Sequence, residues 1–293
     1  MSITRARLVE LIDLAEPAIA LINTSTVEHD DYAIETLTFR LGDAEVRGIL
    51  TRPLDTTGSL PAILYGHSHG GHYDIGAEEL LTGREYLQSP LGPVFARAGY
   101  VTLCLDMPVF GLRSTVTESA AAKALLWHGK SLFGQMLSDH AAALTYLAGR
   151  ADVDSSRIGA FGISMGCTLS YWLAAMDDRI AAVAHLCCFA DQRTMIELGA
   201  HDGHGIYMIV PGLLAETDAG AIAALVAPRP QLVTIGEADR LTPPLAVQRA
   251  WADLELAYAS TPNNLHLISE PGIGHQETPR MREAMLAFFA ANL

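Results

Sequence analysis

The chain has 293 residues, half of them hydrophobic, and a formal net charge of -14. An acidic surface repels nucleic-acid phosphates, so we expect no nucleic-acid partner. No apolar run reaches the roughly 18 residues that a membrane helix needs, so we also expect no membrane span.

The first elements along the chain are predicted to be a helix and an antiparallel hairpin. Apolar residues recur at helical spacing over residues 4–15, and Pro17 marks the end of that helix. Apolar and polar residues alternate over 37–41, and a second strand is expected over 46–50 after a Gly-Asp turn. This hairpin should form an edge of the sheet.

The rest of the chain alternates short buried strands with helices. We expect strands at 61–66, 100–106, 158–163, 180–189, 231–236 and 265–269. We expect helices at 84–97, 130–149, 165–176, 244–258 and 277–292, with 107–128 irregular or briefly helical. The alternation predicts an α/β fold with a mostly parallel central sheet and helices on both faces. We interpret 1–293 as one domain, in which an excursion at about 190–226 caps a pocket.

Four cysteines occur without the paired spacing of a metal site: Cys104, Cys167, Cys187 and Cys188. We expect buried free thiols, which suit a reducing compartment. The N-terminal segment carries Glu10, Asp13 and Glu16, which would interrupt the apolar core of a signal peptide. These two observations predict a cytoplasmic protein.

The clearest chemical motif is Gly-x-Ser-x-Gly at Gly162–Gly166, centred on Ser164. It lies between an apolar strand and a helix with an apolar face. A serine on such a tight strand-to-helix turn is lifted out of the backbone and exposed to substrate. The first N–H groups of the following helix also favour negative charge beside it. We therefore predict that Ser164 is a nucleophile.

A nucleophilic serine needs a base to take its proton and a carboxylate to hold that base. In the serine–acid–histidine order of this kind of fold, Asp239 follows the strand at 231–236 and His275 follows the strand at 265–269. We predict a triad of Ser164, Asp239 and His275. Glu237 and Asp191 are alternative acids, because each also follows a strand end.

The oxyanion formed during acyl transfer needs two N–H donors. One is expected from the backbone of Met165, directly after the nucleophile, and the other from the loop after the strand at 61–66. We predict the backbone amide of His69 as the second donor, with Ser68 or Gly70 as alternatives. Its imidazole is free to line the pocket.

The sequence resembles serine α/β-hydrolases of the dienelactone-hydrolase and acetyl-xylan-esterase-like branch over about residues 31–293. The resemblance rests on Pro61–Leu64, His67–Gly70, Gly162–Gly166, Ala227–Pro230, Gly236–Pro243 and His275. It implies a cofactor-free enzyme that cleaves short ester bonds, with a small-molecule ester as its partner. Most relatives have His-Gly where this chain has His67-Ser68, which leaves the exact oxyanion donor open. Dienelactone hydrolases proper use a cysteine nucleophile, so Ser164 disfavours that substrate.

Three other functions are compatible with parts of this sequence. A lactone hydrolase or a small peptidase would use the same fold and triad, although prolyl-oligopeptidase-like enzymes carry an additional domain that this chain lacks room for. A metal-dependent hydrolase would use His67, His69 and His72, but Gly71 stands where such a loop has its aspartate. A binding protein without catalysis would be favoured by a lost triad residue. We expect no metal, and the oligomeric state is not predicted.

Five residues lie in segments that should border the site: Phe110, Trp127, His128, Tyr207 and Met208. Aromatic and apolar side chains commonly line small-molecule pockets. We therefore name them as candidate substrate contacts, with core packing as the alternative for each.

Overall fold

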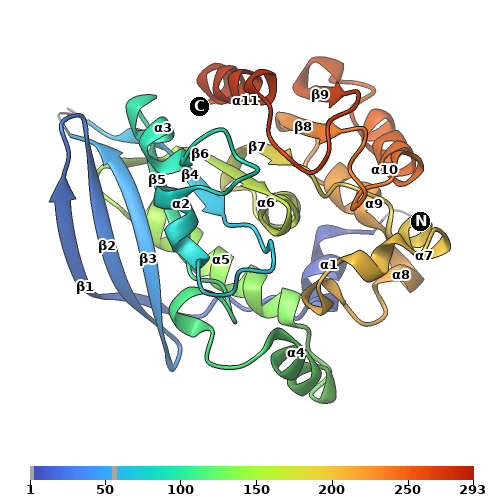
Figure 1. Cartoon of the computed structure of the whole chain (residues 1–293), viewed down its shortest axis with the longest axis horizontal. Helices are drawn as coiled ribbons and strands as arrows, with labels where there is room; N and C mark the ends of the chain where they lie inside the picture. The colour runs from blue at the N-terminus through green and yellow to red at the C-terminus, as the bar shows by residue number, and fades with distance from the viewer. Residues whose placement is uncertain (1–2, 55–57) are drawn as a thin grey trace.

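A computed structural model describes residues 3–54 and 58–293, and it contains one nine-stranded sheet in the order β1-β2-β3-β5-β4-β6-β7-β8-β9 (Figure 1). The strands are β1 (Ile19–Glu28), β2 (Tyr32–Leu41), β3 (Ala44–Pro53), β4 (Leu60–Gly66), β5 (Val101–Leu105), β6 (Val153–Ile163), β7 (Ile180–Leu186), β8 (Gln231–Gly236) and β9 (Leu265–Glu270). Strands β4 to β9 are mutually parallel, whereas β1, β2 and β3 are antiparallel and join the rest through β5. The predicted mostly parallel sheet with an antiparallel edge is confirmed.

Helices cover both faces of this sheet. They are α1 (Arg5–Leu11), α2 (Glu79–Thr82), α3 (Leu91–Arg97), α4 (Glu118–Trp127), α5 (Leu132–Ala148), α6 (Met165–Met176), α7 (Gln192–Glu197), α8 (Leu213–Glu216), α9 (Ala219–Ala224), α10 (Pro244–Ala257) and α11 (Pro279–Asn292). Short 3-10 turns are η1 (Gly76–Glu78), η2 (Gly111–Arg113), η3 (Ala200–Gly203), η4 (Ile206–Met208) and η5 (Pro262–Asn264). One large apolar core joins the sheet to α1, α5, α6, α9 and α10, and a second joins it to α2, α3 and α11.

The parallel topology determines where a site can form. Because strands β4 and β6 to β9 run in the same direction, their carboxyl ends meet at one edge of the sheet. Ligands of open α/β sheets bind in the crevice outside these ends. The segments that directly follow these strands, including the start of α6, carry every residue of the predicted triad and both predicted oxyanion donors.

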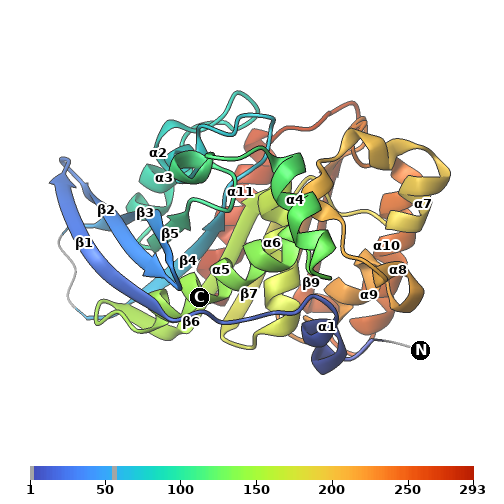
Figure 2. The ribbon, with the colours of Figure 1, turned by 90° about the horizontal axis from the view of Figure 1, so that it is seen from below.

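The antiparallel edge is larger than the hairpin predicted from the sequence. Strand β1 adds a third strand, and all but its first residue are exposed. Its sequence therefore lacks the apolar alternation that identifies a half-buried strand. The antiparallel strands occupy one end of the sheet, and the excursion lies toward the other (Figure 2).

The helix predicted over 84–97 is wrong in its first half. Only Leu91–Arg97 is helical there, and a separate short helix ends at Thr82. Gly83 has φ +68°, which ends that helix, and Pro90 disfavours helical backbone at the residue before it. Residues 83–90 are therefore a loop.

Strand β7 is shorter than the predicted 180–189. It ends at Leu186, because Cys187 (φ 49°) and Cys188 (φ 114°) leave the extended conformation. Positive φ is costly for side chains other than glycine, and such strain gathers at functional sites. Both cysteines are buried, and all four in the chain are free thiols, as predicted.

The excursion at 190–226 consists of short helices and 3-10 turns. It contains α7, η3, η4, α8 and α9, and Asp191 and Asp218 cap α7 and α9 at their N-termini.

No helix in residues 3–54 and 58–293 combines the length and apolar character needed to cross a membrane.

Two buried histidines should make the stability of the fold sensitive to acid. Burial, with a smaller contribution from His67, lowers the pKa of His140 to about 3, and burial lowers that of His185 to about 3 as well. An unfolded histidine titrates near about 6.5. Below that pH the unfolded chain binds protons that the two buried rings of the folded chain do not bind. The contribution of these histidines to the free energy of unfolding is therefore fully present above about pH 6.5 and is lost on acidification. Each histidine should lower the free energy of unfolding by about 2 kcal/mol at pH 5.

Urea denaturation at pH 7 and pH 5 tests this prediction with His140→Phe. Removing the titrating ring should shrink the difference in unfolding free energy between the two pH values by about 2 kcal/mol. The exposed His128→Gln is the matched control. An acid sensitivity as large in His140→Phe as in the wild type would contradict the prediction.

Candidate active site

Ser164 lies at the junction between β6 and α6 and has φ 59° and ψ -118°. This conformation is strained for a residue with a Cβ atom. The surrounding backbone holds it, because the Ser164 N–H donates to the carbonyls of Leu186 and Cys187, both at 3.0 Å. The strand-to-helix turn predicted from Gly-x-Ser-x-Gly is therefore present, with the serine half-buried at its tip.

Three glycines allow this turn to pack against β4. A Cβ atom on Gly166 would lie 1.8 Å from the carbonyl oxygen of Gly66, far inside van der Waals contact. A Cβ atom on Gly162 would lie 2.4 Å from the carbonyl carbon of Gly166. The motif therefore contains glycine because the backbone segments approach too closely for any side chain.

Asp239 and His275 meet as predicted from their positions after β8 and β9. His275 Nδ1 lies 2.7 Å from Asp239 Oδ2, and the Leu241 N–H donates to Asp239 Oδ1 at 2.9 Å. The Asp239 side chain is 1 % exposed and that of His275 is 20 % exposed. Burial disfavours the Asp239 carboxylate, but the hydrogen bond and the charge of His275 outweigh it and lower the pKa of Asp239. The pair can hold the Nδ1 proton and leave Nε2 available.

The alternative acids are engaged elsewhere. Asp191 caps α7 by accepting from the Thr194 N–H at 2.8 Å. Glu237 accepts from the Ser269 hydroxyl at 2.6 Å. Among the described residues, His275 has Asp239 as its only carboxylate partner within hydrogen-bonding distance.

The Ser164 hydroxyl has no hydrogen bond to His275 within the described parts of the chain. Catalytic hydrogen bonds are often long without substrate and tighten in the reacting complex. The structure thus brings both residues to one edge of the sheet and pairs the histidine with its acid.

The three backbone amides in the loop after β4 that could serve the oxyanion hole differ in whether they already have a hydrogen-bond acceptor. The Ser68 N–H donates to Glu79 Oε1 at 2.9 Å, so this amide is already occupied. The N–H groups of His69 and Gly70 have no acceptor in residues 3–54 and 58–293. Met165 is the first residue of α6, and the N–H groups of a helical first turn lack intrahelical acceptors.

The His69 imidazole attaches this loop to two more distant segments. Its Nε2 lies 2.7 Å from Glu118 Oε2 at the start of α4. Glu118 also accepts from the Tyr73 hydroxyl at 2.6 Å and from the Tyr207 N–H at 2.8 Å. Burial disfavours the carboxylate, but these bonds, that from His69 foremost, keep the pKa of Glu118 below its usual value. Gly205 lies close beside it, and a Cβ atom there would lie 2.6 Å from Glu118 Oε1.

The candidate pocket residues fall into different environments. Phe110 is fully buried and its ring packs edge-on against those of His67 and His69. Tyr207 is buried and stacks on His69 at 5.4 Å between ring centroids. Met208 lines a cavity of about 490 Å³ formed by residues 192–214. Trp127 is 90 % exposed and His128 is also exposed, so the proposed site does not include these two residues.

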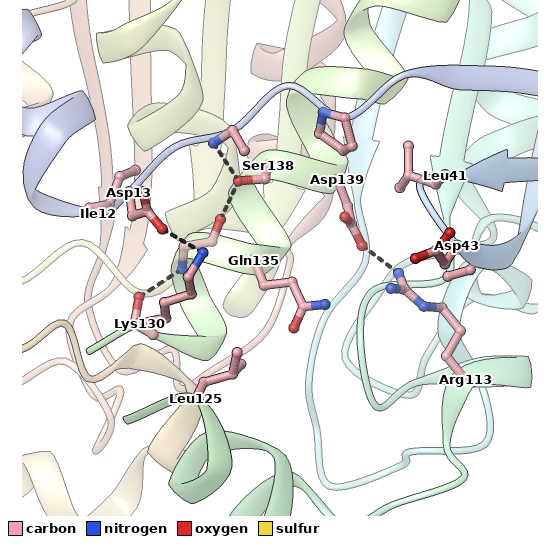
Figure 3. Close-up of a pocket in the computed structure, with 15 residues that line it drawn as sticks. Ile12, Asp13, Leu41, Asp43, Arg113, Leu125, Lys130, Gln135, Ser138 and Asp139 are labelled. Atoms are coloured by element: carbon pink, nitrogen blue, oxygen red, sulfur yellow. Dashed lines mark hydrogen bonds and ion pairs between the residues drawn. The ribbon is translucent and has the colours of Figure 1, made fainter. Parts of the chain in front are cut away.

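A separate cavity of about 410 Å³ lies between the end of α1, α5 and the β2–β3 turn (Figure 3). It is bordered by the ion pairs Asp13–Lys130 and Arg113–Asp139, which Figure 3 draws as dashed lines. None of the predicted triad residues lines it. It is therefore distinct from the candidate active site.

The histidines of the loop after β4 do not form a common ligand set. His67 Nδ1 lies 2.9 Å from the Ser68 carbonyl, and its Nε2 accepts from the Met107 N–H at 3.2 Å. His69 uses Nε2 toward Glu118 and accepts from the Gly71 N–H at Nδ1. The ring nitrogens of His67 and His69 thus bond protein groups in the loop, in α4 and after β5, which gives no support to the metal-hydrolase alternative.

Three residues near the site were not identified from the sequence. Glu79 and Glu118 are surrounded by partners distant in the chain, so no local pattern marks them. Cys187 follows β7 at the same sheet edge as the triad, but the strand predicted over 180–189 included it, so its place after a strand end was not evident from the sequence.

Comparisons with known proteins agree with this architecture. Residues 91–210 match the model of the Dienelactone hydrolase family. The chain is 37 % identical over 264 residues to YtaP of Bacillus subtilis (strain 168), covering 89 % of this chain and 88 % of that protein. That protein is named a putative hydrolase.

Solved esterase structures share the fold. Acetyl xylan esterase 1 from Thermoanaerobacterium sp. JW/SL YS485 is 17 % identical with a TM-score of 0.68, covering 98 % of this chain and 92 % of that one. A protein assigned as an acetyl xylan esterase from Bacteroides fragilis NCTC 9343 is 20 % identical with a TM-score of 0.71, covering 90 % and 73 %. The similarity to these structures identifies the arrangement of sheet and helices described above as an α/β-hydrolase fold. The family match and the 37 % identity to YtaP show that the chain belongs to the dienelactone hydrolase family.

Proposed function

We propose that this protein is a serine esterase that cleaves short-chain carboxylic esters through an acyl-enzyme intermediate. The observation that carries the proposal is the strained Ser164 at the sheet edge where His275 is hydrogen-bonded to the buried Asp239. That arrangement supplies a nucleophile, a base and a group that orients the base.

The proposed reaction has two halves. Ser164 Oγ attacks the ester carbonyl carbon while its proton passes to His275 Nε2, and Asp239 stabilises the resulting imidazolium through Nδ1–H. The tetrahedral intermediate collapses, the bond to the alcohol oxygen breaks, and His275 returns the proton to the departing alkoxide. Water then attacks the acyl-serine with the same base, releasing the carboxylic acid and restoring Ser164.

We assign the developing oxyanion to the N–H groups of Met165 and His69. Preorganised backbone donors stabilise this charge without reorganisation during the reaction. The engaged Ser68 amide supports His69 over Ser68, and the His69–Glu118 bond fixes the loop that presents the donor.

Substitution of His69 should distinguish a backbone role from a ligand role. His69→Ala keeps the amide, so we expect it to retain a measurable fraction of activity, with a loss of about tenfold from the untethered loop. His69→Pro removes the donor and should lose on the order of 10²-fold or more. Circular dichroism checks that the proline variant folds. Complete loss in His69→Ala, with recovery by added zinc, would contradict the backbone role.

A panel of p-nitrophenyl esters from acetate to dodecanoate tests the proposed substrate class. We expect the highest kcat/KM on acyl groups of two to four carbons, as the resemblance to acetyl-ester hydrolases implies. Including a simple lactone and a chromogenic peptide covers the alternative substrates. No hydrolysis of any ester by folded protein, or a preference for the longest chains, would overturn this function or its size class.

A further inference from the structure

Beside the proposed triad lies a thiol that the proposed mechanism does not use. Cys187 Sγ, one carboxylate oxygen of Asp239 and one ring nitrogen of His275 all lie within 4.8 Å of one another. In residues 3–54 and 58–293, no other three histidine, cysteine or acidic side chains come together in this way. The three come from the ends of β7, β8 and β9, so the sheet itself holds them together.

This ligand set has the chemistry of a zinc site. Zinc binds cysteine sulfur, imidazole nitrogen and carboxylate oxygen at about 2.0–2.3 Å, and three protein ligands leave a fourth position open. Those bond lengths place tetrahedral ligand atoms roughly 3.3–3.7 Å apart. The 2.7 Å His275–Asp239 pair must therefore open, and the thiol must approach by about 1 Å. Such movements are within the reach of side-chain rotation.

Contacts of Cys187 and Asp239 permit this rearrangement. The Cys187 thiol has only a weak contact, at 4.0 Å, to the Gln276 carbonyl, so it gives up little by turning toward a metal. Asp239 keeps the Leu241 N–H on Oδ1, which would orient Oδ2 as a ligand. Burial, with the nearby Asp239 charge, raises the pKa of the Cys187 thiol, so a metal would have to displace its proton.

We propose that Cys187, Asp239 and His275 form an inhibitory Zn²⁺ site. Binding forms bonds from zinc to the thiolate sulfur, an imidazole nitrogen and a carboxylate oxygen, and releases the thiol proton to solvent. The metal separates His275 from Asp239 and binds one imidazole nitrogen. His275 can then no longer accept the Ser164 proton, so ester hydrolysis stops. The inhibitory consequence rests on the proposed esterase function, whereas the binding does not.

Cobalt binding tests the site without relying on activity. Co²⁺ bound to a thiolate gives a near-ultraviolet charge-transfer band, which we expect at one equivalent per chain in the wild type and in Ser164→Ala. The band should vanish in Cys187→Ala and in Cys187→Ser, with folding checked by circular dichroism. Cys188→Ala, which removes the neighbouring buried thiol, should keep it. A band that persists without Cys187, or that is absent from the wild type at millimolar Co²⁺, overturns the proposal.

Zinc inhibition of ester hydrolysis tests the consequence. Zn²⁺ should inhibit the wild type and Cys188→Ala reversibly, with recovery on adding EDTA. Cys187→Ala should remain active and need at least tenfold more Zn²⁺ for half inhibition. Equal inhibition with and without Cys187 would overturn its role as a ligand. If the wild type shows no esterase activity, the proposed function fails, and the cobalt band still decides the metal site.

Discussion

Replacing Ser164 by alanine should reduce ester hydrolysis on the order of 10⁴-fold or more while leaving the fold intact. The large loss is expected because nucleophile, base and acid act as a unit, so removing one leaves the others without a covalent pathway. The fold should be unaffected by alanine, because the close backbone approaches in this turn involve Gly162, Gly166 and Gly66 rather than the serine side chain. The measurement is kcat/KM on a p-nitrophenyl acetate series, with unfolding followed by circular dichroism.

Ser170→Ala is a matched control on the same helix. Ser170 is buried, and its hydroxyl donates to the Gly166 carbonyl at 2.7 Å. We expect this variant to keep wild-type turnover within severalfold. Substantial activity in Ser164→Ala would show that another residue is the nucleophile.

Asp239→Asn should lower turnover by roughly 10²–10⁴-fold through a misoriented imidazole. The carboxylate now accepts the Nδ1–H of His275, whereas an amide can present its NH₂ group and favour the wrong tautomer. KM should change far less than kcat, because Asp239 is buried behind the histidine and does not face substrate.

Two neighbouring acids provide controls for this variant. Glu237→Gln and Asp191→Asn should keep most of the activity, since their carboxylates bond Ser269 and Thr194 rather than His275. Asp191→Asn should lose some stability by weakening the cap of α7. Much greater damage from either control than from Asp239→Asn would mean that the acid has been misplaced.

The sequence predicted the parallel half of the fold well for a physical reason. Strands such as β4 and β5 are buried on both faces, so their sequences are continuous apolar runs bounded by turn residues. The exposed strand β1 lacks that signal, and the loop at 83–90 contains a short run, Arg84–Gln88, whose residue types are compatible with a helix. Local pattern thus identified the strands that are buried on both faces and missed the exposed β1.

The candidate site divides along the same line. Ser164, Asp239 and His275 were predicted because each follows a strand end, and the topology brings those ends together. Contacts fixed only by tertiary packing were not predictable, such as that between His69 and Glu118, 49 residues apart in the chain. The environment of Trp127 was likewise hidden, since a large aromatic residue suggests burial and this one is 90 % exposed.

Labelling with a fluorophosphonate tests the central claim most directly, because the probe reacts far faster with a serine activated by its base than with an ordinary hydroxyl. Peptide mass spectrometry of the labelled wild type should find one adduct per chain, on Ser164, and labelling should be much slower in His275→Ala. A stoichiometric adduct on a different residue, or no adduct on folded protein that hydrolyses esters, would contradict the account.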